Sequence, residues 1–170
     1  MAPLVRRAWA PRGRTPELVQ RTRSHKKVSI IAALAVSPAR DAVRLYFRLY
    51  ADRNIKAAEV VDFLRQLRRH LKRPAIVVLD RLAAHRSKRV RALLVATPAL
   101  HIELLPPYAP ELNPVEYLWS FLKLNPLANR AFFEVDTLAD TARAQTRILQ
   151  RDEKLLRSFL AHSPLSLHLI

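Results

Sequence analysis

Leu105–Trp119, with the sequence LPPYAPELNPVEYLW, predicts a rigid loop that leads into a helix. The loop carries three prolines, Pro106, Pro107 and Pro110. Proline and the residue before it avoid the helical region, so this part is expected to be extended. Pro114 suits a first helical turn, and a helix is predicted from there to about Leu124. Glu116 then lies in that first turn, where the helix dipole stabilises a carboxylate.

Upstream of this stretch, apolar segments predict a series of strands. They are Arg6–Ala10, Val28–Val36, Val43–Tyr50, Ala75–Leu79 and His101–Leu105. The turn Ser37–Asp41 joins the second and third segments into a hairpin. Val28–Val36 and Ala75–Leu79 are nearly continuous apolar runs, which are typical of strands buried on both faces.

Helical spacing of apolar residues predicts helices between and after these strands. The expected helices are Ile55–Lys72 with Asn54 as N-cap, Ser87–Ala96, and one or two amphipathic helices within Asp136–Ala161. The alternation of strands and helices indicates an α/β fold with a central mixed sheet flanked by helices. We expect a main domain over residues 1–150 and a helical tail over 151–170.

The composition excludes several classes of site and favours a polyanionic partner. The chain has 170 residues, no cysteine and one glycine, Gly13. These counts exclude thiolate chemistry and glycine-rich nucleotide-binding loops. Its 30 Lys and Arg against 14 Asp and Glu give a net charge of +16, so nucleic acid is the first expected partner. Neither a membrane span nor a signal-peptide core is evident, and a cytoplasmic protein without a membrane partner is expected.

Two acidic residues are the candidate chemical site. Asp80 follows the strand Ala75–Leu79, and ligand-binding groups in α/β sheets favour the C-terminal ends of strands. Together with Glu116 it could hold a hard cation such as Mg²⁺, which prefers oxygen ligands. The alternative is that Asp80 caps a turn and Glu116 only stabilises its helix.

Two motifs resemble the catalytic core of mariner-like DDE transposases, in the bacterial insertion-sequence branch. They are LDRLAAH at 79–85 and LPPYAPELNPVEYLWSFLK at 105–123, with 35 residues between Asp80 and Glu116. VRRAWAPRGRTPEL at 5–18 and KVSIIAALAVS at 27–37 are also similar to that branch. The resemblance covers about residues 3–150.

This resemblance implies an RNase H-like fold and cleavage of DNA at transposon ends, followed by strand transfer, with two Mg²⁺ or Mn²⁺ ions. Asp80 would be the second metal-binding acid and Glu116 the third, and Tyr108 would shape the loop between them. The other residues expected to bind DNA or to support the site are Arg81, His85, Arg86, Lys88, Asn113 and Lys123. The implied partners are DNA and either a second copy of this chain or an N-terminal partner chain. The implied location is the bacterial nucleoid.

The sequence departs from the family in one respect. The first catalytic Asp normally lies on a strand just upstream of a segment like APLVRRAW, and here the chain starts at Met1. We therefore expect the first strand to be missing and the chain to be inactive by itself. Glu17, Asp41 and Asp52 do not follow a central strand and are not expected to replace that acid.

Two other functions remain open from the sequence. One is a non-catalytic basic remnant that binds DNA or a transposase. The other is an RNA-binding protein, which predicts aromatic residues on an exposed sheet face. Tyr46, Phe47 and Tyr50 are instead expected to be buried in the hairpin. The basic helix face of Arg65, Arg68, Arg69 and Lys72 is either solvated or in contact with a DNA backbone.

Overall fold

The computed structural model describes residues 10–14, 27–125, 127–129, 132, 134–165 and 169. Trp9, Glu17 and all but the last residue of the strand expected over Arg6–Ala10 lie outside this part. The described strands are β1 (Val28–Val36), β2 (Val43–Ala51), β3 (Ala75–Leu79) and β4 (Leu100–Leu104). The described helices are α1 (Ala57–Leu71), α2 (Lys88–Val95), the short 3₁₀ helix η1 (Pro110–Leu112), α3 (Pro114–Leu124), α4 (Val135–Arg151) and α5 (Glu153–His162).

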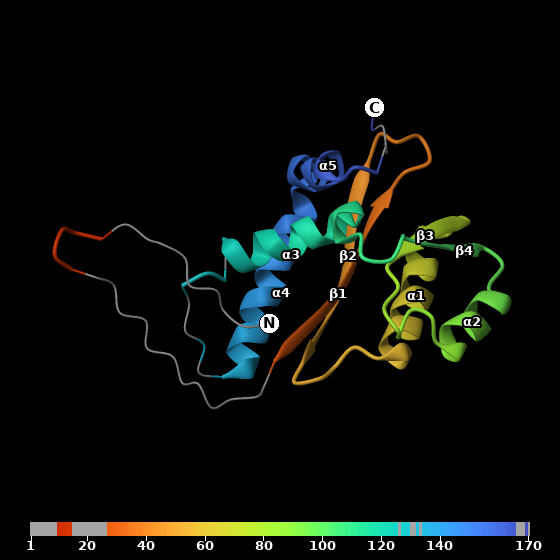
Figure 1. Ribbon diagram of the computed structural model, residues 1–170, viewed down its shortest axis with the longest axis horizontal. Coiled ribbons are helices and arrows are strands. Elements are labelled where there is room, and N and C mark those ends of the chain that lie inside the picture. The colour runs from red at the N-terminus through yellow and green to blue at the C-terminus, as the bar shows by residue number, and fades with distance from the viewer. Residues whose placement is uncertain are drawn as a thin grey trace.

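A long antiparallel hairpin of β1 and β2 forms the middle of the molecule (Figure 1). Val28 pairs with Ala51 at one end and Val36 with Val43 at the other, as the apolar pattern predicts. In the connecting turn, Oγ of Ser37 accepts a hydrogen bond of 3.1 Å from the backbone N–H of Asp41 and donates one of 2.5 Å to its carboxylate. The hairpin expected from the sequence is therefore confirmed.

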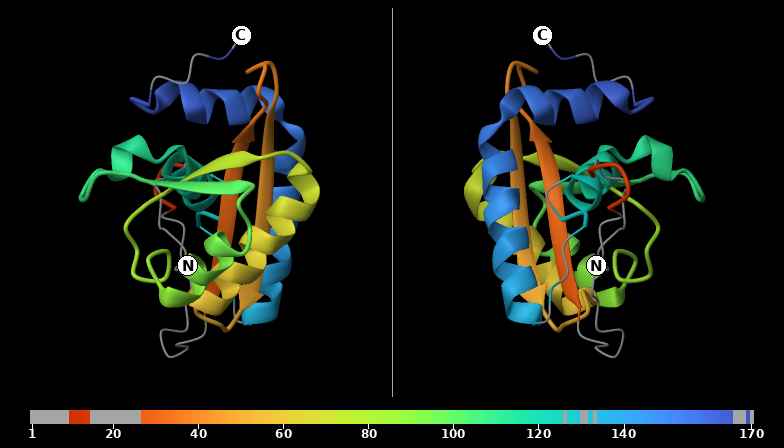
Figure 2. Two further views of the ribbon diagram at one scale, coloured as in Figure 1. Left: turned by 90° about the vertical axis from the view of Figure 1, so that its right-hand side faces the viewer. Right: turned by 90° about the vertical axis from the view of Figure 1, so that its left-hand side faces the viewer.

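Helices cover the hairpin from both sides (Figures 1 and 2). On one side α3, α4 and α5 pack on it, with Leu45, Leu118, Leu122 and Leu156 fully buried between them. On the other side lie α1, α2 and the strands β3 and β4, around a second core that includes Val60, Leu64, Val90 and Leu100. The predicted α/β fold with flanking helices is confirmed.

The described strands form two separate sheets, and this corrects the expectation of one continuous central sheet. β1 pairs with β2, and β3 pairs in parallel with β4. The expectation that β3 is buried on both faces is also wrong. Its Val77 packs against the α1–α2 core, whereas Ile76 is 69% and Val78 49% exposed. No described element covers that outer face or pairs with the second edge of β3, which agrees with a missing first strand.

Several element boundaries differ from the sequence prediction by one or two residues. Lys56, not Asn54, is the N-cap of α1, because the Glu59 carboxylate reaches back and accepts a 3.0 Å hydrogen bond from the Lys56 N–H. In a capping box, the side chain of the third helical residue accepts a hydrogen bond from the N-cap N–H, and Glu59 makes this contact. β4 begins one residue earlier than expected, at Leu100.

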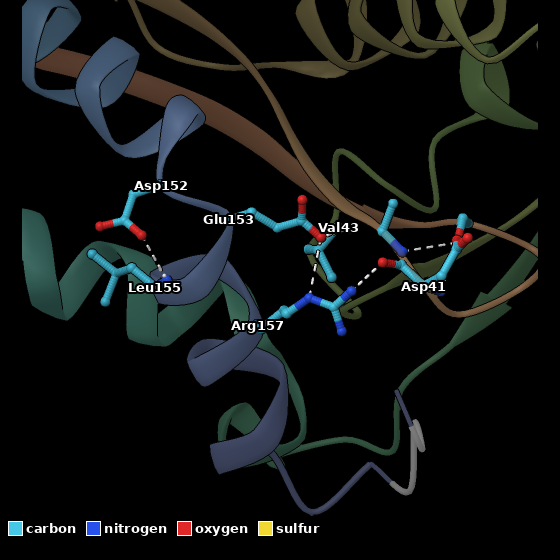
Figure 3. Close-up of polar contacts among 8 residues, drawn as sticks. Asp41, Val43, Asp152, Glu153, Leu155 and Arg157 are labelled. Carbon is cyan, nitrogen blue, oxygen red and sulfur yellow. Dashed lines mark hydrogen bonds and ion pairs between the residues drawn. The ribbon is translucent and has the colours of Figure 1, made fainter. Parts of the chain in front are cut away.

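A polar cluster fixes α5 to the end of the hairpin (Figure 3). The Glu153 carboxylate accepts hydrogen bonds of 3.2 Å from the backbone N–H of Val43 and 3.1 Å from Nε of Arg157. Arg157 also donates to the carbonyl oxygen of Asp41. Asp152 caps α5 by accepting from the N–H of Leu155 at 3.0 Å.

The division into two domains at residue 150 stays a prediction, although α5 contributes to the same core as β2 and α3. Within the described ranges, none of the helices has the length and hydropathy required to cross a bilayer.

Candidate active site

Asp80 and Glu116 line the same cavity, of about 260 Å³. Asp80 follows the last residue of β3, and Glu116 lies in the first turn of α3. The proline-rich loop from Leu105 to Pro110 forms much of the remaining wall. Two elements far apart in sequence thus bring together the two acids that the sequence singled out.

One oxygen of the Asp80 carboxylate is held by two donors. Oδ1 accepts a 3.0 Å hydrogen bond from the backbone N–H of Leu82 and lies 2.6 Å from Nδ1 of His85. Oδ2 takes no hydrogen bond from the described residues. His85 is thus in hydrogen-bond contact with Asp80, and its role at the site stays a prediction.

Asn113 fixes the start of α3 and with it the position of Glu116. Its side-chain oxygen accepts a 3.2 Å hydrogen bond from the N–H of Val115, and its carbonyl accepts one of 3.0 Å from Glu116. Partial burial raises the pKa of the Glu116 carboxyl, and the nearby charge of Asp80 raises it further. Lys123, about two turns further along α3, opposes both effects and lowers that pKa. The second effect arises because both acids line one cavity, so the charge of Asp80 acts on Glu116.

The remaining sequence-predicted residues fall into two groups. Arg81 lines the cavity, and its Nε donates a 2.9 Å hydrogen bond to the carbonyl of Leu105. Arg86 and Lys88 are exposed at the start of α2 and do not line the cavity. The Arg86 carbonyl accepts two hydrogen bonds from the Arg91 side chain, which organises this turn.

Tyr108 has a conformation that the sequence did not predict. Its side chain is fully exposed at the cavity and its φ is +57°, a left-handed conformation that is rare for a bulky residue. The flanking prolines predicted an extended loop. A left-handed residue inside such a loop has no signal in composition or spacing.

The described residues contain no group of three or more acidic or histidine side chains that could hold a metal ion. Asp41 lies in the hairpin turn and Asp52 in the turn after β2, where it has φ +48°. Neither of them lines the cavity of Asp80 and Glu116. The site therefore offers two carboxylates from the described part of the chain.

A family model described as DDE superfamily endonuclease matches residues 2–139 of this chain. The chain belongs to that family. The chain is also similar in structure to the Mos1 mariner transposase. In the Mos1 strand transfer complex the match has a TM-score of 0.67 and 19% identity, and covers 97% of this chain and 48% of the Mos1 chain. The catalytic domain of Mos1 matches with a TM-score of 0.56 and 20% identity, over 81% of this chain and 76% of that chain. These likenesses show a shared RNase H-like fold.

A curated relative of this chain is the uncharacterized protein y4pE/y4sA of Sinorhizobium fredii (strain NBRC 101917 / NGR234). It is 38% identical over 64 residues, which cover 38% of this chain and 44% of the relative. The chain thus matches about half of the length of this relative and of the Mos1 chain in the strand transfer complex.

Proposed function

We propose that this chain is the catalytic part of a mariner-type DNA transposase, which cleaves phosphodiester bonds at the ends of an insertion sequence and joins them to a target. The observation that carries the proposal is the convergence of Asp80 and Glu116 on one cavity. The carboxyl end of a parallel strand is where α/β proteins bind their ligands. The net charge of +16 suits a DNA backbone.

The two carboxylates fit a hard divalent cation. Glu116 and Oδ2 of Asp80 are oxygen donors, the type that Mg²⁺ and Mn²⁺ prefer. Burial raises the pKa of Glu116 and the charge of Asp80 raises it further, and a bound cation would offset both effects. One of the similar structures is a Mos1 paired-end complex with Mn, which supports the choice of metal. When bound, two such ions would activate the attacking oxygen and stabilise the charge on the leaving oxygen.

The other residues of the site would bind and orient the DNA. Arg81 at the cavity, and Lys88 and Arg86 beside it, are cations placed to contact phosphates, which positions a duplex without reading its sequence. In the first reaction, the oxygen of water bonds to phosphorus and the bond to the 3′ oxygen breaks, which leaves a 3′-OH and a 5′-phosphate. In the second, that 3′-OH attacks a phosphorus of the target strand and displaces its 3′ oxygen.

The chain alone is proposed to be inactive, because the described residues supply two acids where the family uses three. None of the described strands pairs with the second edge of β3, and a parallel two-stranded sheet with an open face is an unusual arrangement. A strand added in parallel to that edge would end beside Asp80, since the carboxyl ends of parallel strands meet at one sheet edge. An N-terminal partner chain that carries an aspartate at the end of such a strand would complete the site.

The test is Mn²⁺-dependent cleavage of a labelled duplex that carries the end of the encoding insertion sequence, with and without the upstream Asp-containing segment added as a separate chain. Cleavage is expected only with that segment, and Asp80→Asn or Glu116→Gln should abolish it. Glu111→Gln is the matched control, because Glu111 is an exposed acid on η1 outside the cavity. Cleavage that survives both site substitutions would contradict the proposal.

A second candidate is a non-catalytic DNA-binding remnant. The two-acid site in the described residues favours it. It predicts salt-sensitive DNA binding and no cleavage in either arrangement. The RNA-binding alternative is weaker, since Tyr46, Phe47 and Tyr50 are half-buried in β2 and present no exposed aromatic face.

A further inference from the structure

The segment after Asp80 folds back so that His85 lies against it. The N–H groups of His85 and Arg86 both donate to the carbonyl of Leu82, at 2.9 and 3.3 Å. This tight turn ends at Ser87, whose hydroxyl caps α2 by accepting from the N–H of Val90 at 3.3 Å. The His85 side chain is only 14% exposed, so its ring is held by packing as well as by hydrogen bonds.

The contact between His85 and Asp80 makes the two carboxylate oxygens of Asp80 unequal. The side chain of Asp80 is 46% exposed, and the terminal torsion of an aspartate is otherwise broad. Two donors, Nδ1 of His85 and the N–H of Leu82, hold Oδ1. Oδ2 has no donor among the described residues. Since an ionised carboxylate only accepts hydrogen bonds, Nδ1 carries the proton in this contact.

We propose that His85 is a positioning residue, which holds Oδ1 of Asp80 through its Nδ1–H and thereby presents Oδ2 as the single oxygen that Asp80 gives to a divalent cation. The part of this inference that concerns the cation rests on the proposed function. Groups that orient a metal-binding carboxylate through hydrogen bonds change metal affinity without touching the metal. The cation gains a carboxylate that is already oriented before it binds.

The chain contains a similar pair that serves as an internal control. Nε2 of His101 lies 2.9 Å from the Glu103 carboxylate on β4, with the two side chains 66% and 63% exposed. This pair does not line the cavity of Asp80 and Glu116. A substitution of His101 therefore removes a histidine–carboxylate contact without changing the orientation of Asp80.

The test uses Mn²⁺ alone as the probe, with free Mn²⁺ measured by electron paramagnetic resonance in titrations of the purified chain. His85→Phe keeps a ring but removes the donor, and should raise the dissociation constant for Mn²⁺ by about tenfold. His85→Asn places an amide N–H as many bonds from Cα as Nδ1, and should recover part of the affinity. His101→Phe should leave the affinity unchanged. Unfolding temperatures of all variants are measured alongside, so that a loss of fold is recognised.

The outcomes separate this inference from the proposed function. If the wild-type chain binds Mn²⁺, either of two results overturns the positioning role. In the first, His85→Phe binds Mn²⁺ as well as the wild-type chain does. In the second, His85→Asn binds it no better than His85→Phe. A wild-type chain that binds no Mn²⁺ contradicts the proposed metal site instead. In that case the ¹⁵N spectrum of the histidine rings tests the contact between His85 and Asp80. A proton that sits on Nδ1 of His85 in the wild-type chain and leaves this nitrogen in Asp80→Asn supports the inference. A proton on Nε2 with none on Nδ1 in the wild-type chain overturns it.

Discussion

Arg81 donates a 2.9 Å hydrogen bond from Nε to the carbonyl oxygen of Leu105, which links the end of β3 to the beginning of the proline-rich loop. The backbone N–H of Leu105 in turn donates to the carbonyl of Leu79 at 2.8 Å. Two hydrogen bonds thus join the end of β3, which leads to Asp80, to the loop that leads to Glu116. Arg81 therefore contributes to the shape of the site in addition to its charge.

Arg81→Ala should lower the free energy of unfolding by about 1 kcal/mol, the usual net value of one intramolecular hydrogen bond. The Leu105 residue is buried, so its carbonyl would lose a partner that water does not easily replace. Urea denaturation of the purified chain measures the change. Arg86→Ala is the control, since the side chain of Arg86 is exposed and only its backbone carbonyl is used. An equal loss in both variants would contradict the role of Arg81.

Glu116→Gln should stabilise the chain at neutral pH and have little effect in acid. Because burial and Asp80 raise the folded-state pKa of Glu116 above its ordinary value of 4.5, the folded state binds this proton more tightly than the unfolded state. The contribution of Glu116 to stability is thus present below pH 4.5 and is lost as the pH rises through the folded-state pKa. The gain should stay below about 1 kcal/mol, because solvent screens this exposed residue.

Thermal unfolding of the Glu116→Gln variant at pH 3 and pH 7, relative to wild type, checks the sign. Glu111→Gln, which replaces an exposed acid of η1 outside the cavity, is the matched control. A stabilisation by Glu116→Gln that is equal at both pH values would argue against a raised pKa.

Leu118→Ala should destabilise the chain by about 2–5 kcal/mol, because it removes a fully buried side chain between α3 and the hairpin and leaves a cavity. Leu124→Ala, at the exposed end of the same helix, should cost far less. Chemical denaturation of both variants compares them. Similar losses in the two would mean that α3 does not pack on β1–β2 as described.

Lys88→Gln should weaken binding to duplex DNA and reduce the slope of log affinity against log salt concentration by about one, as expected for the loss of one phosphate contact. Lys88 is exposed at the start of α2, near the turn that follows Asp80. Lys154→Gln removes the same charge on α5, across the hairpin from α2, and should change the slope less (Figure 1). Fluorescence anisotropy at several salt concentrations measures both slopes. Equal slopes for these two variants would place the DNA elsewhere.

Most of the secondary structure could be predicted because its signals are local. The apolar runs predicted β1, β2 and β3, and the proline before Val115 predicted the start of α3. The N-cap of α1 could not be predicted, because it depends on which of several nearby side chains reaches the helix end. The exposure of Ile76 and Val78 could not be predicted either, since an apolar run shows that a strand can be buried, not that another element covers it.

The amino-acid sequence alone was enough to establish the excess of positive charge, the order of strands and helices, and the two acids that the motifs place at 80 and 116. Each of these depends on residue type or on spacing along the chain. Three relationships became evident only in the folded chain. Nδ1 of His85 holds one oxygen of Asp80, and Arg81 binds the Leu105 carbonyl. The charge of Asp80 adds to the effect of burial in raising the pKa of Glu116. These relationships depend on distances and burial between atoms, and the folded chain sets those through contacts that no local pattern encodes.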